Sequence, residues 1–291
     1  MNRPLVSVLM TAYNREMFIA DAIESVINSS YNNFELIIVD DCSTDKTIEI
    51  ARKYEALDQR IKVYLNDENL GDYLNRNKAA QYAIGKYIKY LDADDLIYPH
   101  GLEVMIQSME KFPMAAFGTQ SNKREDKKPY PILIEPSNSY LEHYFEGGLF
   151  LAGPTGVIIN REIFDLEGGF TGKRYIGDTE LWLKLAAKYF VVKFQPSLIW
   201  WRTHLDQEIN KERSTFEPQL MRYHLDKQNI LSYNCPLTPD KQKVAFNKLN
   251  RRFILNSLIQ VISKRKKINT IRYFLDADIG LKNILKAIFH K

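Results

Sequence analysis

The architecture of this chain is best inferred from one segment, Gly85-Lys-Tyr-Ile-Lys-Tyr-Leu-Asp-Ala-Asp-Asp-Leu-Ile-Tyr-Pro99. Its first half, residues 87–91, alternates aromatic and aliphatic residues with Lys, which is typical of a β-strand entering a core. The strand runs into three carboxylates within four positions, Asp92, Asp94 and Asp95. In an extended segment Asp92 and Asp94 point to the same side, because side chains repeat every second residue.

Two carboxylates on one side of a strand repel each other unless a cation or a proton lies between them. A hard divalent ion with oxygen ligands would relieve that repulsion, so the pair predicts a metal site. The alternative is a strand-end turn in which the Asp side chains face water or cap a helix, since Asp is common in turns. The pair by itself does not decide between the two interpretations.

The residues before this segment repeat the same arrangement. Apolar runs of strand length at 5–10, 35–39 and 61–65 alternate with segments of helical periodicity, which predicts a parallel sheet wound with helices. Such sheets bind ligands at the carboxyl ends of their strands. Polar residues follow three of the predicted strands, which favours a ligand site over a simple turn: Tyr13-Asn14, Asp40-Asp41 and Asp92–Asp94.

The second half of the chain predicts a less regular series of elements. Residues 121–138 are polar and Pro-rich and predict a surface loop. The other expected elements are a helix after Pro99 to about Phe112, strands at 115–119, 191–194 and 198–201, a turn entering a strand within 153–160, a helix at 179–189, and helices from about Phe216 onward.

Length and composition indicate an ordinary globular protein. The chain has 291 residues, 45% of them hydrophobic and 26% charged, enough for one large domain with or without an appendage. Two cysteines form no disulfide framework, which fits a reducing compartment. The N-terminus lacks a signal-peptide pattern, and no stretch approaches the ~20 apolar residues that span a bilayer. We therefore expect a cytoplasmic protein.

The positive charge is concentrated at the C-terminus. Residues 241–291 hold 13 Lys/Arg and 2 Asp/Glu, a local charge of +11, whereas the whole chain carries +4, so the remainder carries −7. No nucleic acid is expected, because no recognition module accompanies the charge. Basic amphipathic helices suit an anionic membrane surface, which predicts peripheral contact with the inner face of the cytoplasmic membrane. The alternative is a helix packed on the protein with its lysines in water.

Taken together, these motifs resemble the family 2 glycosyltransferases over roughly residues 4–205. The resemblance implies an α/β GT-A fold, a wound mixed sheet flanked by helices, with a helical C-terminal extension. It implies a catalytic domain at 1–210, with a nucleotide-binding half to about residue 100 and an acceptor-binding half at 101–210, and a basic helical extension at 211–291. It rests on six segments in the family's order: 6–14, 37–45, 69–77, 91–95, 177–183 and 201–204.

The family resemblance also implies the substrates and the metal: a UDP-sugar donor, Mn²⁺ or Mg²⁺ on its diphosphate, and a glycan or lipid-linked acceptor. Asp94 is the implied metal ligand, and Asp92 lies beside it near the metal or the ribose. His204 would complete the coordination or touch the diphosphate; otherwise it is a surface histidine after a strand. Arg202 would be a counter-charge for the diphosphate.

The same resemblance implies a nucleotide pocket. Asp41 corresponds to the aspartate that accepts a hydrogen bond from the uracil N–H, with a strand-end turn residue as the alternative. Arg76 is expected near the nucleotide or the phosphates, although Asp72, Asn75 and Lys78 depart from the commoner pattern around it. Three residues after the first strand would line the pocket: Thr11, Ala12 and Tyr13.

The reaction requires a base, because a sugar hydroxyl is a poor nucleophile at neutral pH. Asp178 matches the family's base, with a helix N-cap as the alternative interpretation. Glu180 ranks second, and Gly177 stands where the family usually has an acidic residue. A single carboxylate suffices for an in-line displacement that inverts the anomeric carbon.

Two other functions stay open at this stage. One is a nucleotide-sugar-binding protein that keeps the fold and has lost transfer. The other is a nucleotidyltransferase of similar sheet architecture, but residues 11–14 lack the Gly-rich phosphate loop that such an enzyme needs. The Gln-x-x-Arg-Trp motif and membrane helices of processive synthases are absent from the sequence, which favours the addition of one or a few sugars.

Overall fold

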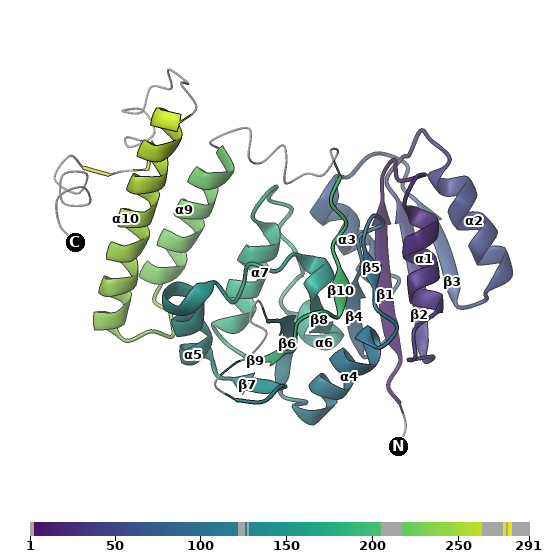
Figure 1. The fold of residues 1–291 in the computed structure, drawn as a ribbon, viewed down its shortest axis with the longest axis horizontal. Coiled ribbons are helices and arrows are strands. Elements are labelled where there is room, and N and C mark those ends of the chain that lie inside the picture. Colours follow the sequence, from purple (N-terminus) through teal and green to yellow (C-terminus); the bar gives the residue numbers. More distant parts are fainter. Residues whose placement is uncertain are drawn as a thin grey trace. The chain divides into compact units, whose positions relative to one another are not determined.

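The largest element is an eight-stranded mixed sheet with the strand order β3-β2-β1-β4-β8-β6-β9-β7 (Figure 1). Strands β3, β2, β1 and β4 are parallel, as predicted, β8 is antiparallel to both β4 and β6, and β7 is antiparallel to β9. The strands are β1 (Val6–Ala12), β2 (Phe34–Asp40), β3 (Ile61–Leu65), β4 (Tyr87–Tyr90), β6 (Ala115–Gln120), β7 (Ile132–Ile134), β8 (Val157–Asn160) and β9 (Phe190–Phe194).

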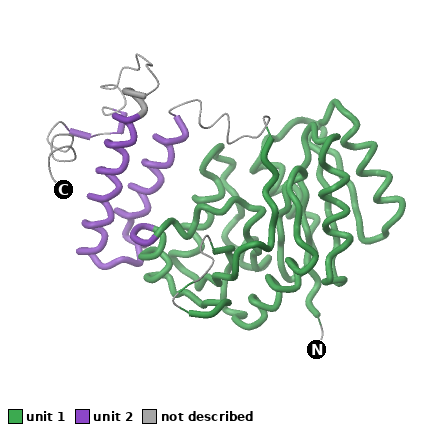
Figure 2. Tube along the Cα trace, in the orientation of Figure 1, with its two compact units in different colours: residues 1–143, 147–204 green, residues 144–146, 205–291 purple. Residues whose placement is uncertain are grey.

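This computed structural model describes residues 3–121, 126, 128–204, 217–263, 276, 277, 279 and 280. The chain divides into two compact units, residues 1–143 with 147–204 and residues 144–146 with 205–291 (Figure 2). The boundary expected at residue 210 lies outside the described residues, so the domain division inferred from the sequence stays a prediction.

Helices connect the strands of the first unit. β1 and β2 are almost entirely buried, because helices cover a parallel sheet on both faces. A separate two-stranded sheet pairs β5 (Leu96–Ile97) with β10 (Ile199–Trp200). The helices are α1 (Ile19–Ile27), α2 (Thr47–Leu57), α3 (Asp72–Ala80), α4 (Gly101–Lys111), α5 (Pro136–Leu141), α6 (Arg161–Leu166) and α7 (Gly177–Ala186), with a π-helical turn at Glu142–Gly147.

The parallel arrangement brings the carboxyl ends of β1, β2 and β4 to one edge of the sheet. Ala12 pairs with Asp40 at the carboxyl ends of β1 and β2, and the backbone N–H of Leu91, just after β4, donates to Leu9 O of β1 at 3.0 Å. Strand order reverses direction between β1 and β4, which is where wound sheets bind ligands. The polar segments after β1, β2 and β4 therefore meet at this edge.

Two local predictions were wrong. The extended conformation expected for Asp92 and Asp94 was wrong, because the strand ends at Tyr90 and residues 92–95 form the alternative, a strand-end turn, with the N–H of Asp95 donating to Asp92 O at 2.9 Å. The surface loop predicted at 121–138 contains β7 and the start of α5, since the apolar residues Ile132–Ile134 pair with β9. The helical periodicity of roughly Asp72–Ile84 predicted a longer helix than α3, which ends at Ala80, and α6 was not predicted.

Within its described residues, the second unit contains the helices α9 (Glu217–Leu231) and α10 (Pro239–Ser263), as the helical pattern predicted. They pack through the rings of Tyr223 and Phe253, 4.4 Å apart, and the hydroxyl of Tyr223 donates to Asn250 Oδ1 at 2.8 Å. Lys264–Lys267 and nearly all of the predicted amphipathic segment at 279–289 lie outside the described residues. Among the residues that the structure describes, no helix combines the length and apolar character needed to cross a membrane.

Candidate active site

The turn after β4 gathers three carboxylates. Asp92, Asp94 and Asp95 can each offer one ligand oxygen, and these three atoms lie within 4.8 Å of one another. The N–H of Asp92 donates to Thr155 Oγ1 at 3.0 Å, which ties the turn to the loop before β8. Burial, together with the charges of Asp92 and Asp94, raises the pKa of Asp95 to about 8. The negative charge of this acidic turn is therefore not fully relieved by the protein itself.

Asp92 is paired with a buried arginine. Arg76 on α3 places Nη2 2.8 Å from Asp92 Oδ1, and its Nε donates to Asp72 Oδ1 at 2.9 Å. Burial acts to raise the pKa of Asp92, but the charge and hydrogen bond of Arg76, together with Thr155 and the charge of Lys89, outweigh it, and the pKa lies below its usual range. Arg76, expected near the nucleotide or phosphates, is thus a partner of the acidic turn; its contact with a nucleotide stays a prediction.

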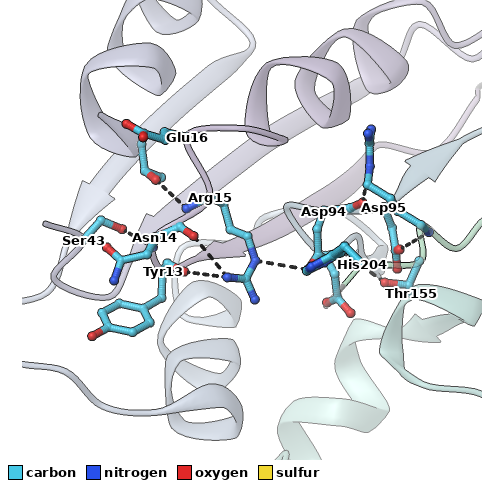
Figure 3. Close-up of polar contacts among 12 residues, drawn as sticks. Tyr13, Asn14, Arg15, Glu16, Ser43, Asp94, Asp95, Thr155 and His204 are labelled. Carbon is cyan, nitrogen blue, oxygen red and sulfur yellow. Dashed lines mark hydrogen bonds and ion pairs between the residues drawn. The ribbon is translucent and has the colours of Figure 1, made fainter. Parts of the chain in front are cut away.

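Asp94 lies between two cationic or potentially cationic side chains (Figure 3). Its Oδ2 accepts from Arg15 Nε at 3.1 Å and lies 3.0 Å from His204 Nε2. The His204 ring packs on Phe18, with centroids 4.7 Å apart. His204, 110 residues away in sequence, therefore lies beside the predicted metal ligand, whereas Arg15 was not anticipated.

Arg202 joins the end of β10 to the acidic turn. Its backbone N–H donates to Asp95 Oδ1 at 3.0 Å, and its side-chain Nε donates to the carbonyl of Asp94 at 3.0 Å. Its Nη2 donates to Asp21 Oδ2 at 2.9 Å, and the guanidinium lies over the Phe18 ring. These contacts hold the turn in place; the predicted role of Arg202 as a diphosphate counter-charge stays untested.

The side chains around Asp94 fit a divalent cation. Carboxylate oxygens and one imidazole are ligands that Mn²⁺ accepts, and Mg²⁺ takes the oxygens. Asp92 is held by the buried Arg76, whereas Asp94 Oδ2 lies 3.0 Å from a second candidate ligand, His204 Nε2. Asp94 and His204 are therefore the side chains best placed to hold the metal.

The expected nucleotide-pocket residues lie at the ends of β1 and β2. Thr11 and Ala12 end β1, and Tyr13 follows with 48% exposure. Asp41 is buried and accepts hydrogen bonds from Leu70 N at 2.8 Å, Gly71 N at 2.9 Å and Asn66 Nδ2 at 2.7 Å. A carboxylate has about four acceptor positions, and these three hydrogen bonds leave one position of Asp41 for a further donor.

Asp178 is the second residue of α7 and does not cap it, because the N-cap is Ile176. The burial of Tyr73 on α3 raises the pKa of its hydroxyl, and the charge of Asp178 raises it further, so Asp178 lies near the helix that carries Arg76. Glu180, the second-ranked base, forms an ion pair with Lys173 at 2.6 Å.

Gly177 leaves room for the ring of Tyr73. A Cβ atom at this position would lie 2.8 Å from two atoms of that ring. A larger side chain at this position would therefore press on the ring of Tyr73.

Sequence reasoning missed Lys89, which lies in β4, directly before the acidic turn. The side chain is fully buried and donates to the carbonyl oxygens of Tyr90 and Thr155. Burial lowers its pKa to about 7, against the opposing charges of Asp92 and Asp95. Its only signal in the sequence was a lysine inside an otherwise apolar strand.

Comparison with known proteins shows that the chain is similar to glycosyltransferases. The profile described as "Glycosyl transferase family 2" matches residues 7–166. A Bacillus subtilis protein named "Putative teichuronic acid biosynthesis glycosyltransferase TuaG" is 39% identical over 138 residues, 47% of this chain and 55% of that protein. An uncharacterized glycosyltransferase of Methanocaldococcus jannaschii is 44% identical over 112 residues, 38% of this chain and 39% of that protein. The match thus spans about half the length of the first relative and less of the second.

Solved structures resemble the whole chain. TarS 1–349 of S. aureus, in complex with UDP, has a TM-score of 0.69 at 19% identity and covers 98% of this chain and 81% of its own. A mannosyltransferase of Pyrobaculum calidifontis, in complex with GDP-Man and Mn²⁺, has a TM-score of 0.64 at 15% identity and covers 100% of this chain and 89% of its own. At such identities the likeness is one of fold.

Proposed function

The chain belongs to glycosyl transferase family 2 and has the α/β GT-A fold, and from this we propose that it transfers a sugar from a UDP-sugar to a hydroxyl of a glycan or lipid-linked acceptor. We further propose that the product is a cell-surface polysaccharide or its precursor. The name of TuaG refers to teichuronic acid biosynthesis, and the TarS structure holds UDP, which supports both parts of the proposal.

The observation that carries the proposal is the acidic turn at the carboxyl end of β4, with Asp94 beside His204. In the proposed site Asp94 and His204 hold Mn²⁺ or Mg²⁺, which would act as a Lewis acid toward the leaving diphosphate. The nucleotide lies against Thr11, Ala12 and Tyr13, with the uracil N–H donating to the remaining acceptor position of Asp41.

Asp178 is the proposed general base. It accepts the proton of the acceptor hydroxyl while the hydroxyl oxygen attacks the anomeric carbon. The bond from that carbon to the diphosphate oxygen breaks, and UDP leaves with the bonding electron pair. Attack and departure occur on opposite faces in a single displacement, so the configuration of the sugar inverts.

The test is calorimetric titration of UDP into the full chain, first with Mn²⁺ and then with EDTA. We expect binding that depends on the metal and is lost in Asp94→Ala, because the metal then lacks its carboxylate. Titration with GDP in the same buffers tests the choice of nucleotide. Equal binding of UDP in Mn²⁺ and EDTA would contradict metal dependence.

The base is tested separately. Asp178→Asn should keep Mn²⁺-dependent UDP binding and lower the turnover of UDP-sugar by about 10²–10⁴-fold, the usual contribution of a general base. Wild-type activity in Asp178→Asn would exclude the assignment. Binding of UDP with no release of UDP from any UDP-sugar, in the wild-type chain, would favour the alternative of an inactive nucleotide-sugar-binding protein.

A further inference from the structure

We propose that Arg15 is a resident counter-cation of Asp94, that a divalent metal displaces it, and that this exchange couples metal binding to nucleotide binding. The inference rests on the proposed function, and it concerns a residue to which the sequence motifs assign no role. It starts from the direct ion pair, in which Arg15 Nε lies 3.1 Å from Asp94 Oδ2 (Figure 3).

The backbone of Arg15 is fixed, so only its side chain can move. Its N–H donates to Thr47 Oγ1 at 2.7 Å, and its carbonyl accepts from the N–H groups of Phe18 and Ile19, both at 2.9 Å. Asn14, just before it, has a positive φ of 52° and accepts a hydrogen bond from Thr44 N at 2.8 Å. The loop after β1 is thereby locked to the loop after β2.

The guanidinium connects the predicted nucleotide loop with the predicted metal ligand. Its Nη1 donates to the carbonyl oxygens of Tyr13 and Asn14, both at 3.1 Å, while Nε faces Asp94. Among the residues that the structure describes, Nη2 of Arg15 has no hydrogen-bond partner. The N–H groups of Nη2 are therefore available as donors to a further anion.

Arg15 is the most exposed of the four cationic side chains that we find around the acidic turn. Its side chain is 27% exposed, against 19% for Arg202 and 6% for Arg76, and Lys89 is fully buried. Arg76 is also held by two carboxylates, those of Asp72 and Asp92. Arg15 is the cation that can leave at the smallest cost in packing.

A divalent cation and Arg15 cannot share Asp94 without repulsion. Both Arg15 and His204 are directed at the same oxygen, Oδ2, and a bound metal would add two positive charges beside the guanidinium. When the metal binds, the guanidinium therefore leaves this oxygen. Arginine forks match the geometry of phosphate oxygens, so the displaced side chain finds a new partner when a nucleoside diphosphate is present.

The consequence is a coupling between two ligands. Metal alone must displace Arg15 without a replacement partner, whereas metal with UDP provides one. By thermodynamic linkage, UDP then strengthens Mn²⁺ binding and Mn²⁺ strengthens UDP binding by the same factor. Direct contact between metal and diphosphate contributes to this factor as well, so Arg15 accounts for part of it.

The test compares Mn²⁺ binding by the wild-type chain and Arg15→Gln, measured from free Mn²⁺ by electron paramagnetic resonance with and without UDP. Glutamine keeps a donor for the loop carbonyls and removes the charge. We expect Arg15→Gln to bind Mn²⁺ alone about fivefold more tightly, the size of a partly exposed ion pair, because the competing cation is gone. The factor by which UDP strengthens Mn²⁺ binding should fall by at least as much.

Matched variants separate this role from a structural one. Arg15→Lys keeps the charge and should bind Mn²⁺ alone as the wild type does, whereas Arg52→Gln, an exposed arginine on α2, should change neither quantity. A site that is merely disturbed would bind Mn²⁺ more weakly in Arg15→Gln, and that result overturns the inference. So does an unchanged coupling factor. No Mn²⁺ binding by the wild-type chain, with or without UDP, overturns the metal-dependent function itself.

Discussion

At the scale of single residues, the acidic turn is contacted by cationic side chains from separate parts of the chain. Arg76 comes from α3, Arg202 follows β10, and Arg15 precedes α1. Each fixes a different carboxylate or carbonyl of the turn, so the turn is held from several sides before any ligand arrives. Such preorganisation reduces the cost of ordering a site when substrate binds.

The buried Lys89 predicts a pH dependence of stability. Its pKa is about 7 in the folded chain, below the ordinary value of 10.5. Between these values the unfolded chain holds a proton on Lys89 that the folded chain lacks, so this residue makes stability rise with pH from about 7 to 10. Below about pH 7 both states are protonated and the folded state carries the full cost of a buried charge.

We expect Lys89→Met to remove this dependence. The stability of the variant relative to wild type should be most favourable at pH 6 and should decline by about 2 kcal/mol by pH 9. Urea unfolding in EDTA at pH 6, 7.5 and 9 measures it, with the exposed Lys62→Met on β3 as the control. Parallel pH profiles for the wild-type chain and Lys89→Met would show that Lys89 does not titrate in this range.

At the scale of elements, the start of α7 is set by its packing on α3. The ring of Tyr73 occupies the space where Gly177 has no side chain, and Asp178 follows directly. The position of the proposed base therefore depends on close contact between two helices. The sequence indicated an unusual glycine at this point but not its cause.

Gly177→Ala should disturb this contact. We expect a loss of stability of about 1–3 kcal/mol from overpacking, and turnover at least tenfold lower because Asp178 is displaced. Mn²⁺-dependent UDP binding should change by less than about twofold, since the acidic turn lies on another element. Urea unfolding, steady-state kinetics and calorimetry measure the three quantities.

Gly153→Ala is the matched control for this substitution. Its φ is −64°, and an added Cβ would meet nothing within 4 Å. Equal losses in both variants would mean that the effect of Gly177→Ala does not arise from Tyr73. Restoration of turnover when Tyr73→Leu is added to Gly177→Ala would support the steric explanation.

At the scale of the whole molecule, the proposed catalytic residues all belong to the first unit. Asp94, Asp178 and His204 lie in residues 1–143 and 147–204, whereas the described helices of the second unit are α9 and α10. The proposed chemistry assigns no residue to the second unit. From its charge we propose contact with the inner face of the cytoplasmic membrane, where a lipid-linked acceptor would be found.

Reversing the charge of Lys264, Arg265, Lys266 and Lys267 to Glu should weaken binding to phosphatidylserine-containing vesicles at least tenfold, since each basic residue near such a surface contributes about 1 kcal/mol. Co-sedimentation of the full chain measures it, and pure phosphatidylcholine vesicles should bind neither form. The control reverses four exposed basic residues of the first unit, Lys46, Arg52, Lys53 and Lys62. Equal binding of both variants would refute a membrane role for the basic segment.

Local patterns in the sequence were sufficient for the parallel half of the sheet and for the place of the site. The apolar runs that become β1 to β4, and the polar residues after them, predicted a parallel sheet with ligands at one edge, because side-chain periodicity reports backbone conformation and burial. The motif resemblance added the family, which the comparison with known proteins confirms. It also singled out Asp94 and His204, which the structure brings within 3.0 Å of each other.

The partners of these residues were decided only by the tertiary structure. Arg15 lies 79 residues before Asp94, Arg76 turned out to be buried against Asp92, and Tyr73 lies far in sequence from Gly177. Periodicity describes one element at a time and carries no information about which side chains of two elements meet. That depends on how helices and loops pack across the sheet edge, where burial and opposite charge select the contacts.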